Sequence, residues 1–302
     1  MSAQAVTSPP VVATPEPAAR PGAGRRFLRD RRAVVGCSFL LVLALACFGG
    51  GRLAQDPNRQ DLARQPEGPS WSHWFGTDEL SRDVLARVLD GGRVSLQVGL
   101  GTALVATLVG SAAGIAAGYY RRRLDEAMMR LVDLMLILPL LPLAMVLSTA
   151  GTVGPFDGQQ VGGLIAVLSL WMWAPVARVV RAAALEVGRA PFVEAARAVG
   201  ASDVRILVRH MLPNVAGPIA VSGALAVAAA ILLESALSFL GFGAQPPDAT
   251  WGSMLSRSLA TLEVYPWMTL FPGLAILLTV LSVNLMGDGL RDAFDPKSSH
   301  RR

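Results

Sequence analysis

Six long apolar blocks divide this chain, and they limit its possible folds more than any other feature. A helix of about 20 apolar residues spans the roughly 30 Å hydrocarbon core of a bilayer. Backbone groups in lipid must bond internally, and the strands of a closed barrel would be shorter and alternate in polarity. The sequence therefore predicts an all-α polytopic membrane protein with six transmembrane helices. The blocks cover residues 33–51, 94–118, 131–149, 161–184, 215–240 and 267–287.

The charged residues lie almost entirely between these blocks. They make up 16% of the chain, against about 25% in soluble domains. The 27 basic residues recur from one connection to the next instead of forming one face or tail, which argues against nucleic-acid binding and for a topology signal. Both cysteines, Cys37 and Cys47, fall in the first block, where we interpret them as small apolar fillers.

The distribution of arginine predicts that both termini are cytoplasmic. The basic residues concentrate before the first block, in the connections after the second and fourth blocks, and after the last. A lipoprotein-like cleavage site at Ala44–Cys47 is an alternative reading of the first block, but the preceding leader is long for one. We expect a largely disordered tail at 1–32, a first helix at 33–51, an extracytoplasmic loop at 52–93, a five-helix core at 94–288 and a second tail at 289–302.

Small and polar residues inside the blocks suggest how the helices pack. Gly110, Gly114 and Gly118 are four residues apart on one helix face, where small residues let another helix approach closely. Glu234 lies inside a block, where an ionised group is costly unless it faces protein or water. Glu234 and Asn284 are candidates for lining a translocation path or contacting a partner, and hydrogen-bonded packing is the competing interpretation for Glu234.

No motif for enzymatic chemistry is present. Lys297 does not follow a glycine-rich turn, and the three histidines lack metal-ligand spacing with one another. We therefore predict no catalytic residue, no metal site and no cofactor.

The connection after the fourth block, residues 188–214, predicts a helix-turn-helix that we call the elbow. Pro191 suits a first helical turn, Glu194 complements the helix dipole, and Gly200 can end the helix in a left-handed cap. Ser202 or Asp203 can cap a second short helix over 204–212, which Pro213 is expected to stop. The thin first helix and its exposed caps are typical of an element that enters a groove in a partner.

The elbow resembles the Glu-Ala-Ala loop of permease subunits in ATP-binding-cassette importers. In that family this loop forms the coupling helix that docks into the ATPase, so the resemblance implies the same role for the matching residues. These residues are Glu194, Ala195, Ala196, Gly200, Ala201, Ser202, Asp203, Leu212 and Pro213.

Other segments resemble the shorter permease of the peptide and nickel transport branch. They include Phe75-Gly76-Thr77-Asp78, with Ser81 where glycine is more usual, and Trp251-Gly252-Ser253-Met254-Leu255. The resemblance implies a type I importer permease fold in a bacterial plasma membrane and half of a path for di- or oligopeptides. The implied partners are a second permease, two ATPase subunits, a solute-binding protein and lipid. Nickel complexes or another small solute are an alternative cargo, and a self-contained secondary transporter or channel is an alternative class.

Overall fold

The computed structural model describes residues 23–50, 56–60, 65–150, 161–245 and 248–294, and its regular elements are helical. Most of both predicted tails lies outside these residues, and so does the whole connection at 151–160. Within them, the one extended pairing is an isolated bridge between Thr77 and Asp83. The helices are α1 (Ala23–Phe27), α2 (Arg31–Gly49), α3 (Val84–Tyr120), α4 (Arg122–Ile137), α5 (Leu140–Ala150), α6 (Val161–Val187), α7 (Pro191–Ala198), α8 (Asp203–Arg205), a π-helix η2 (Ile206–Met211), α9 (Leu212–Phe239), α10 (Trp251–Ser258), a 3₁₀-helix η3 (Leu259–Thr261) and α11 (Trp267–Phe294).

The helices form a membrane bundle, as the apolar blocks predict. Five helices are long and apolar enough to span a bilayer, and a sixth span results if α4 and α5 together make one crossing. These two helices meet at an 83° bend inside the span predicted over 131–149. Pro139 stands in the break and Pro142 in the first turn of α5; because proline removes a donor and clashes with the preceding turn, it breaks the helix here.

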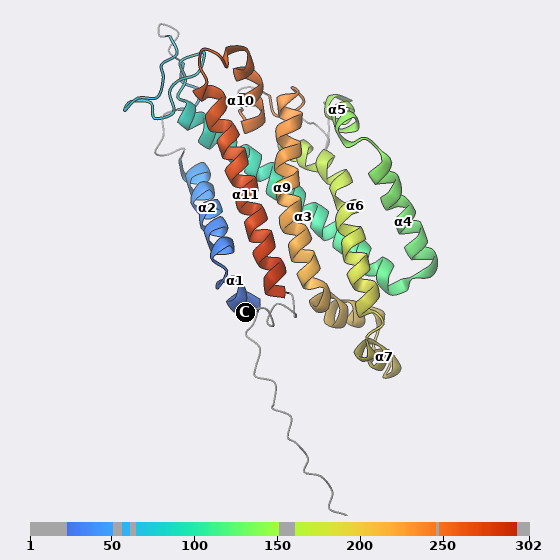
Figure 1. The fold of residues 1–302 in the computed structure, drawn as a ribbon. Helices are drawn as coiled ribbons and strands as arrows, with labels where there is room; N and C mark the ends of the chain where they lie inside the picture. Colours follow the sequence, from blue (N-terminus) through green and yellow to red (C-terminus); the bar gives the residue numbers. More distant parts are fainter. Residues whose placement is uncertain (1–22, 51–55, 61–64, 151–160, 246–247, 295–302) are drawn as a thin grey trace, which may run out of the picture.

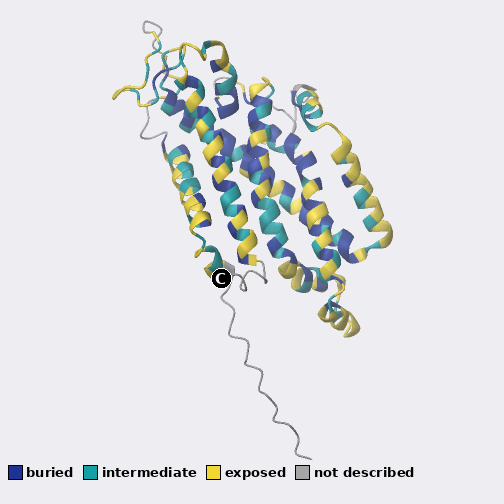
Figure 2. Ribbon diagram, in the orientation of Figure 1, coloured by how far each residue is buried: buried dark blue, intermediate teal, exposed yellow. Residues whose placement is uncertain are grey.

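The centre of the bundle is α3, which lies against α6 and α9 (Figure 1). Outside them, α11 packs between α9 and α2, and α4 lies beside α6. Burial follows this order: the inner helices are largely buried, and α2 and α4 are largely exposed (Figure 2). Exposed apolar side chains on α2, such as Leu41, Val42 and Leu45, are expected where a helix faces lipid or another membrane subunit.

Two helix boundaries differ from the predictions. The loop predicted over 52–93 ends at Asp83, because α3 begins at Val84 with the Asp83 carboxylate accepting from Ala86 N at 2.8 Å. The charged residues Arg87, Asp90 and Arg93 hide this first part of the helix from a search for apolar runs. Its start is signalled instead by the aspartate N-cap.

The prediction that Pro213 stops a short helix is wrong. The chain continues from α8 through the π-helix η2 into α9, with Pro213 in the first turn of α9. In η2 the Leu212 N–H bonds to the Leu207 carbonyl, one residue further back than in an α-helix. Pro213 has no N–H to donate. The wide turn of η2 and the first turn of α9 accommodate it without ending the helix.

The three small residues on α3 bring that helix into close contact with α6. A Cβ on Gly110 would lie 2.5 Å from the Trp173 carbonyl oxygen, and one on Gly114 would lie 2.7 Å from that of Ala177. A Cβ on Gly118 would lie 2.6 Å from Ala184 Cβ. The glycine spacing predicts a closely packed neighbouring helix, and in the structure this neighbour is α6 of the same chain.

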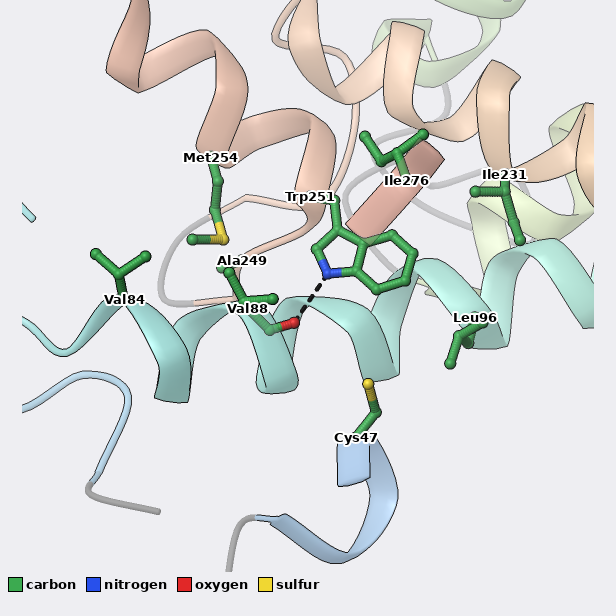
Figure 3. Packing of buried hydrophobic residues seen from close by; sticks show 9 residues of the cluster. All are labelled: Cys47, Val84, Val88, Leu96, Ile231, Ala249, Trp251, Met254 and Ile276. Atoms are coloured by element: carbon green, nitrogen blue, oxygen red, sulfur yellow. Dashed lines mark hydrogen bonds between the residues drawn. The ribbon is translucent and has the colours of Figure 1, made fainter. Parts of the chain in front are cut away.

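The bundle is closed at the end remote from α7 by α10, which the apolar blocks do not predict. Its first residue, Trp251, is fully buried, and its indole Nε1–H donates to the Val88 carbonyl on α3 at 2.8 Å (Figure 3). Around the ring lie Cys47, Leu96, Ile231 and Ile276. Side chains from α2, α3, α9 and α11 thus meet on one tryptophan, which fixes this end of the bundle.

Candidate functional site

The elbow protrudes from the bundle at the end where α3 and α11 finish (Figure 1). As predicted, Pro191 stands in the first turn of α7 and Glu194 follows within that turn. Val193 is fully buried against the bundle, whereas Glu194 and Ala195 are exposed and Ala196 is half-buried. One face of α7 therefore holds the helix in place and the other is open to a partner.

A glycine turn joins α7 to the helices that follow. Gly200 has φ +80°, the left-handed conformation that the sequence predicted. The Ala201 N–H bonds to the Ala196 carbonyl at 3.1 Å across the turn, the hydrogen bond of a Schellman motif. Ser202 stands at the N-cap position of α8 but its side chain makes no capping hydrogen bond. The turn therefore depends on its glycine rather than on a capping side chain.

Tyr119 ties this turn to α3, a role that the sequence analysis did not assign. Its hydroxyl donates to Asp203 Oδ1 at 2.7 Å, and Arg197 lies over its ring at 5.2 Å from the centroid. Because Arg197 precedes Gly200 and Asp203 follows it, one side chain on α3 contacts both arms of the elbow. The only signal in the sequence was a tyrosine at the end of a span.

Apolar contacts fix the remainder of the elbow to α3 and α6. Ile206 and Met211 are fully buried in a cluster with Ile115 on α3 and Val180 on α6. A movement of the elbow must therefore shift α3 and α6, because packed cores rearrange between discrete states rather than deform continuously.

The outward side of the elbow carries exposed apolar residues. Val199 is 84% exposed, and Phe192, Val204, Val208 and Leu212 are also exposed. Apolar side chains on a projecting helical element are typical of a segment that lies in a groove of a partner. The elbow has the shape and surface of a docking element.

Ion pairs brace α4 against α6 near the elbow. Arg181 Nη2 donates to Asp125 Oδ2 at 2.6 Å, and Arg178 is paired with Asp133. These acids lie on α4 and the arginines on α6, so the broken helix pair is tied to the helix that leads into the elbow.

Glu234 lies inside the bundle, with none of its surface exposed. Its carboxyl accepts from Ser95 Oγ on α3 at 2.9 Å and from Ser238 Oγ on α9 at 2.6 Å. Ser95 Oγ in turn lies 3.4 Å from the Trp251 backbone N–H on α10. In this conformation the side chain joins three helices of its own chain. Its role in a path or a partner contact stays a prediction.

Asn284 is half-buried on α11, and its side chain makes no hydrogen bond with any described residue. It is not part of the hydrogen-bond network of Glu234, which involves α3, α9 and α10. The structure thus does not bring these two candidate residues together.

Replacing Glu234 with alanine is expected to destabilise the chain by about 2 kcal/mol, because it leaves a cavity and removes the acceptor of two buried hydroxyls. Glu234→Gln keeps the volume and an acceptor, so a smaller loss is expected. Thermal unfolding in detergent measures both variants. An alanine variant as stable as the parent but inactive in transport would contradict the packing role and favour the path.

Comparisons with known proteins agree with this architecture. The family model described as the binding-protein-dependent transport system inner membrane component matches residues 110–300, and that of the N-terminal transmembrane domain of oligopeptide transport permease C matches residues 22–69. A Brucella suis protein provisionally named a peptide permease is 43% identical over 90% of this chain and 89% of its own length. The glutathione transport system permease protein GsiD of Pectobacterium atrosepticum is 39% identical over 90% and 89%. The chain thus belongs to the family of inner-membrane components of binding-protein-dependent transport systems, the permease subunits of ATP-binding-cassette importers, and within it to the peptide-transport branch.

Proposed function

We propose that this chain forms half of the translocation path for di- or oligopeptides and that separate ATPase subunits drive it through the elbow. The observation that carries the proposal is the elbow itself, a projecting helix-turn-helix with an exposed apolar side and a buried side fixed to α3 and α6. The arrangement converts movement of a docked partner into movement of the spans.

The cargo assignment is supported by the relatives. Those named above are a peptide permease and a glutathione permease, and glutathione is itself a tripeptide. Nickel complexes remain the alternative within the branch. A self-contained secondary transporter is disfavoured, because the matching family consists of components of multi-subunit systems.

The assembly that we propose contains a second permease, two ATPase subunits and an extracytoplasmic solute-binding protein, in the plasma membrane of a bacterium. In this orientation the elbow and both termini are cytoplasmic, in agreement with the arginine distribution. The end of the bundle that carries α10 is then extracytoplasmic.

Reconstitution tests the proposal directly. The four kinds of subunit in proteoliposomes should accumulate labelled dipeptide when ATP and a peptide-loaded binding protein are supplied on the correct sides. Accumulation without ATP, or labelling of a cysteine at position 194 from the extracytoplasmic side in cells, would overturn it.

Tyr119→Phe is expected to lower the number of peptides transported per ATP by about fivefold, since a hydrogen bond to a partly exposed charged group is worth about 1 kcal/mol. The ring and its contact with Arg197 remain, so the fold and basal ATP hydrolysis should persist. Transport and hydrolysis measured on the same proteoliposomes give the ratio.

Tyr120→Phe is the matched control for this variant. Tyr120 is 48% exposed beside Tyr119 and makes no hydrogen bond with a described residue through its hydroxyl. An equal loss in both variants would show that the bond to Asp203 does not position the elbow.

A further inference from the structure

A small cavity opens at the end of the bundle remote from the elbow. It lies between the first turn of α3, the second half of α10 and the start of α11. Its volume is about 40 Å³, which holds about three water-sized groups. This is the size of a carboxylate and is too small for a whole peptide. The charged residues that line the cavity are Asp78, Glu79, Arg82, Arg87 and Arg257.

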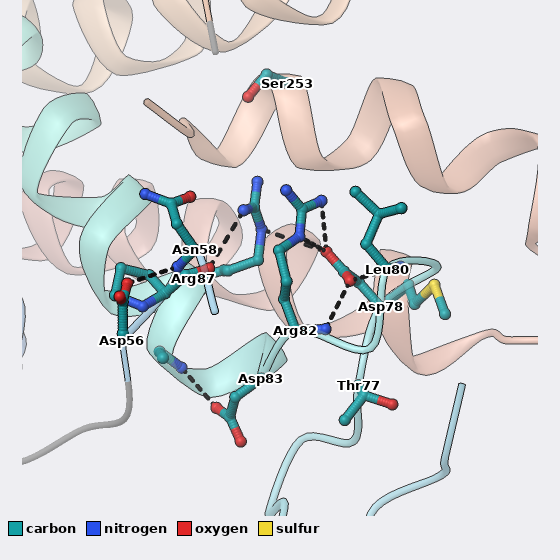
Figure 4. A network of polar contacts seen from close by, with 12 residues as sticks. Asp56, Asn58, Thr77, Asp78, Leu80, Arg82, Asp83, Arg87 and Ser253 are labelled. Carbon is teal, nitrogen blue, oxygen red and sulfur yellow. Dashed lines mark hydrogen bonds and ion pairs between the residues drawn. The ribbon is translucent and has the colours of Figure 1, made fainter. Parts of the chain in front are cut away.

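Two guanidinium groups in this cavity share one carboxylate. Arg82 Nε donates to Asp78 Oδ2 at 2.7 Å, and Arg87 Nε lies 3.5 Å from the same oxygen. Figure 4 shows the two guanidinium groups side by side next to Asp78. Arg87 is 3% exposed, and its other contact is a long one, 3.4 Å from Nη1 to the Pro57 carbonyl. Most of its five N–H donors are therefore without a close acceptor among the described residues.

The turn that presents these groups is rigid. Asp78 Oδ1 accepts from the backbone N–H groups of Leu80 and Arg82, each at 3.0 Å. Ser81 has φ +55°, a left-handed conformation that glycine adopts without strain and other residues rarely adopt. A fixed turn keeps the arginines in position, so little ordering would be needed when an anion binds.

The cavity carries an excess of positive charge. Three arginines line it, against Asp78 and Glu79. Glu79 is held by Thr261, whose Oγ1 donates to Glu79 Oε1 at 3.1 Å. Arg257 is exposed at the rim and forms no ion pair with a described acid. A further carboxylate would balance the excess positive charge and accept hydrogen bonds from the guanidinium groups.

We propose that this cavity is a docking pocket that receives an acidic side chain of the solute-binding protein. Two exposed tryptophans, Trp71 and Trp74, flank His73, whose Nδ1 lies 2.8 Å from the Asp83 carboxylate beside Arg82. Arginine and tryptophan are the residue types that most often dominate protein–protein binding energy, which favours a protein partner over a small ligand. The proposal rests on the proposed function, because it needs this end of the bundle to be extracytoplasmic.

The test uses the full transporter in lipid nanodiscs and follows ATP hydrolysis as the concentration of peptide-loaded binding protein rises. Arg257→Glu should raise the half-saturating concentration about tenfold, since it places like charge against the incoming carboxylate. Basal hydrolysis without binding protein should not change. Arg59→Glu is the matched control, because Arg59 is an exposed arginine in the loop that contacts the start of α3 at Pro57, at the same end of the bundle, and does not line the cavity.

Four outcomes overturn the proposal. An unchanged half-saturating concentration in Arg257→Glu, or an equal shift in Arg59→Glu, removes the pocket and leaves the proposed function intact. If the effect of Arg257→Glu disappears when the peptide carries a C-terminal amide, the carboxylate comes from the cargo and not from the binding protein. A parent transporter that no peptide-loaded binding protein stimulates removes the proposed function as well.

Discussion

Gly200→Leu is expected to reduce ATP-driven peptide uptake by about five- to thirtyfold while the chain still inserts in the membrane. Gly200 has φ +80°, and nothing lies within 4 Å of a Cβ built on it. The penalty is therefore backbone strain rather than a clash, and it amounts to about 1–2 kcal/mol for a residue in this region. Because about 1.4 kcal/mol corresponds to a tenfold change in a population, the docking geometry of the elbow should become rare.

Gly241→Leu is the matched control for this prediction. Gly241 has φ +86° and also has nothing within 4 Å of its Cβ position, but it follows α9 at the other end of the bundle. Both variants carry the same strain, so only the elbow variant should separate ATP hydrolysis from uptake. Normal uptake in Gly200→Leu, or an equal defect in Gly241→Leu, would rule out a special role for the elbow turn. Gly200→Asn should retain most of the uptake, since asparagine tolerates the left-handed conformation.

Gly114→Leu is expected to prevent the chain from folding into a stable bundle. A Cβ at this position would lie 2.7 Å from the Ala177 carbonyl oxygen and 2.9 Å from the Arg181 backbone N. Backbone atoms of a helix cannot move aside as a flexible side chain can, so α3 and α6 would have to separate. Overpacking of this kind costs about 3 kcal/mol or more. The yield of monodisperse protein in detergent and its thermal unfolding temperature should both fall sharply.

The control for Gly114→Leu is Gly162→Leu. Gly162 is an exposed glycine at the start of α6, and nothing lies within 4 Å of its Cβ position. The change in composition and hydropathy is the same, so only the helix contact differs. A stable Gly114→Leu protein would show that α3 and α6 do not pack as closely in the membrane as they do in this structure.

Part of the fold can be predicted from the sequence, because a chain that spans a bilayer must form long apolar helices and these appear as long apolar runs. Apolar runs of spanning length predict helices, and both prolines of the third block mark where α4 and α5 separate. The elbow was also predictable in its local features, since Pro191 and Gly200 act through their own backbone geometry. The predictions were wrong where charge or an unusual turn interrupts a helix. The first turns of α3 carry Arg87 and Asp90, and the π-helix η2 removes the stop expected at Pro213.

The class of the protein, its apolar blocks and the position of the elbow can be predicted from the amino-acid order, because they depend on residues close together in the chain. Three further features required the folded bundle: Gly114 packs on α6, Tyr119 reaches both arms of the elbow, and Arg87 and Arg257 line one cavity. The bundle also places the Glu234 carboxyl among serines of two helices. Apart from the bond between Glu234 and Ser238 within α9, these contacts join residues far apart in the sequence. The helix packing that brings them together is set by side-chain shape across the whole bundle, which no local pattern records.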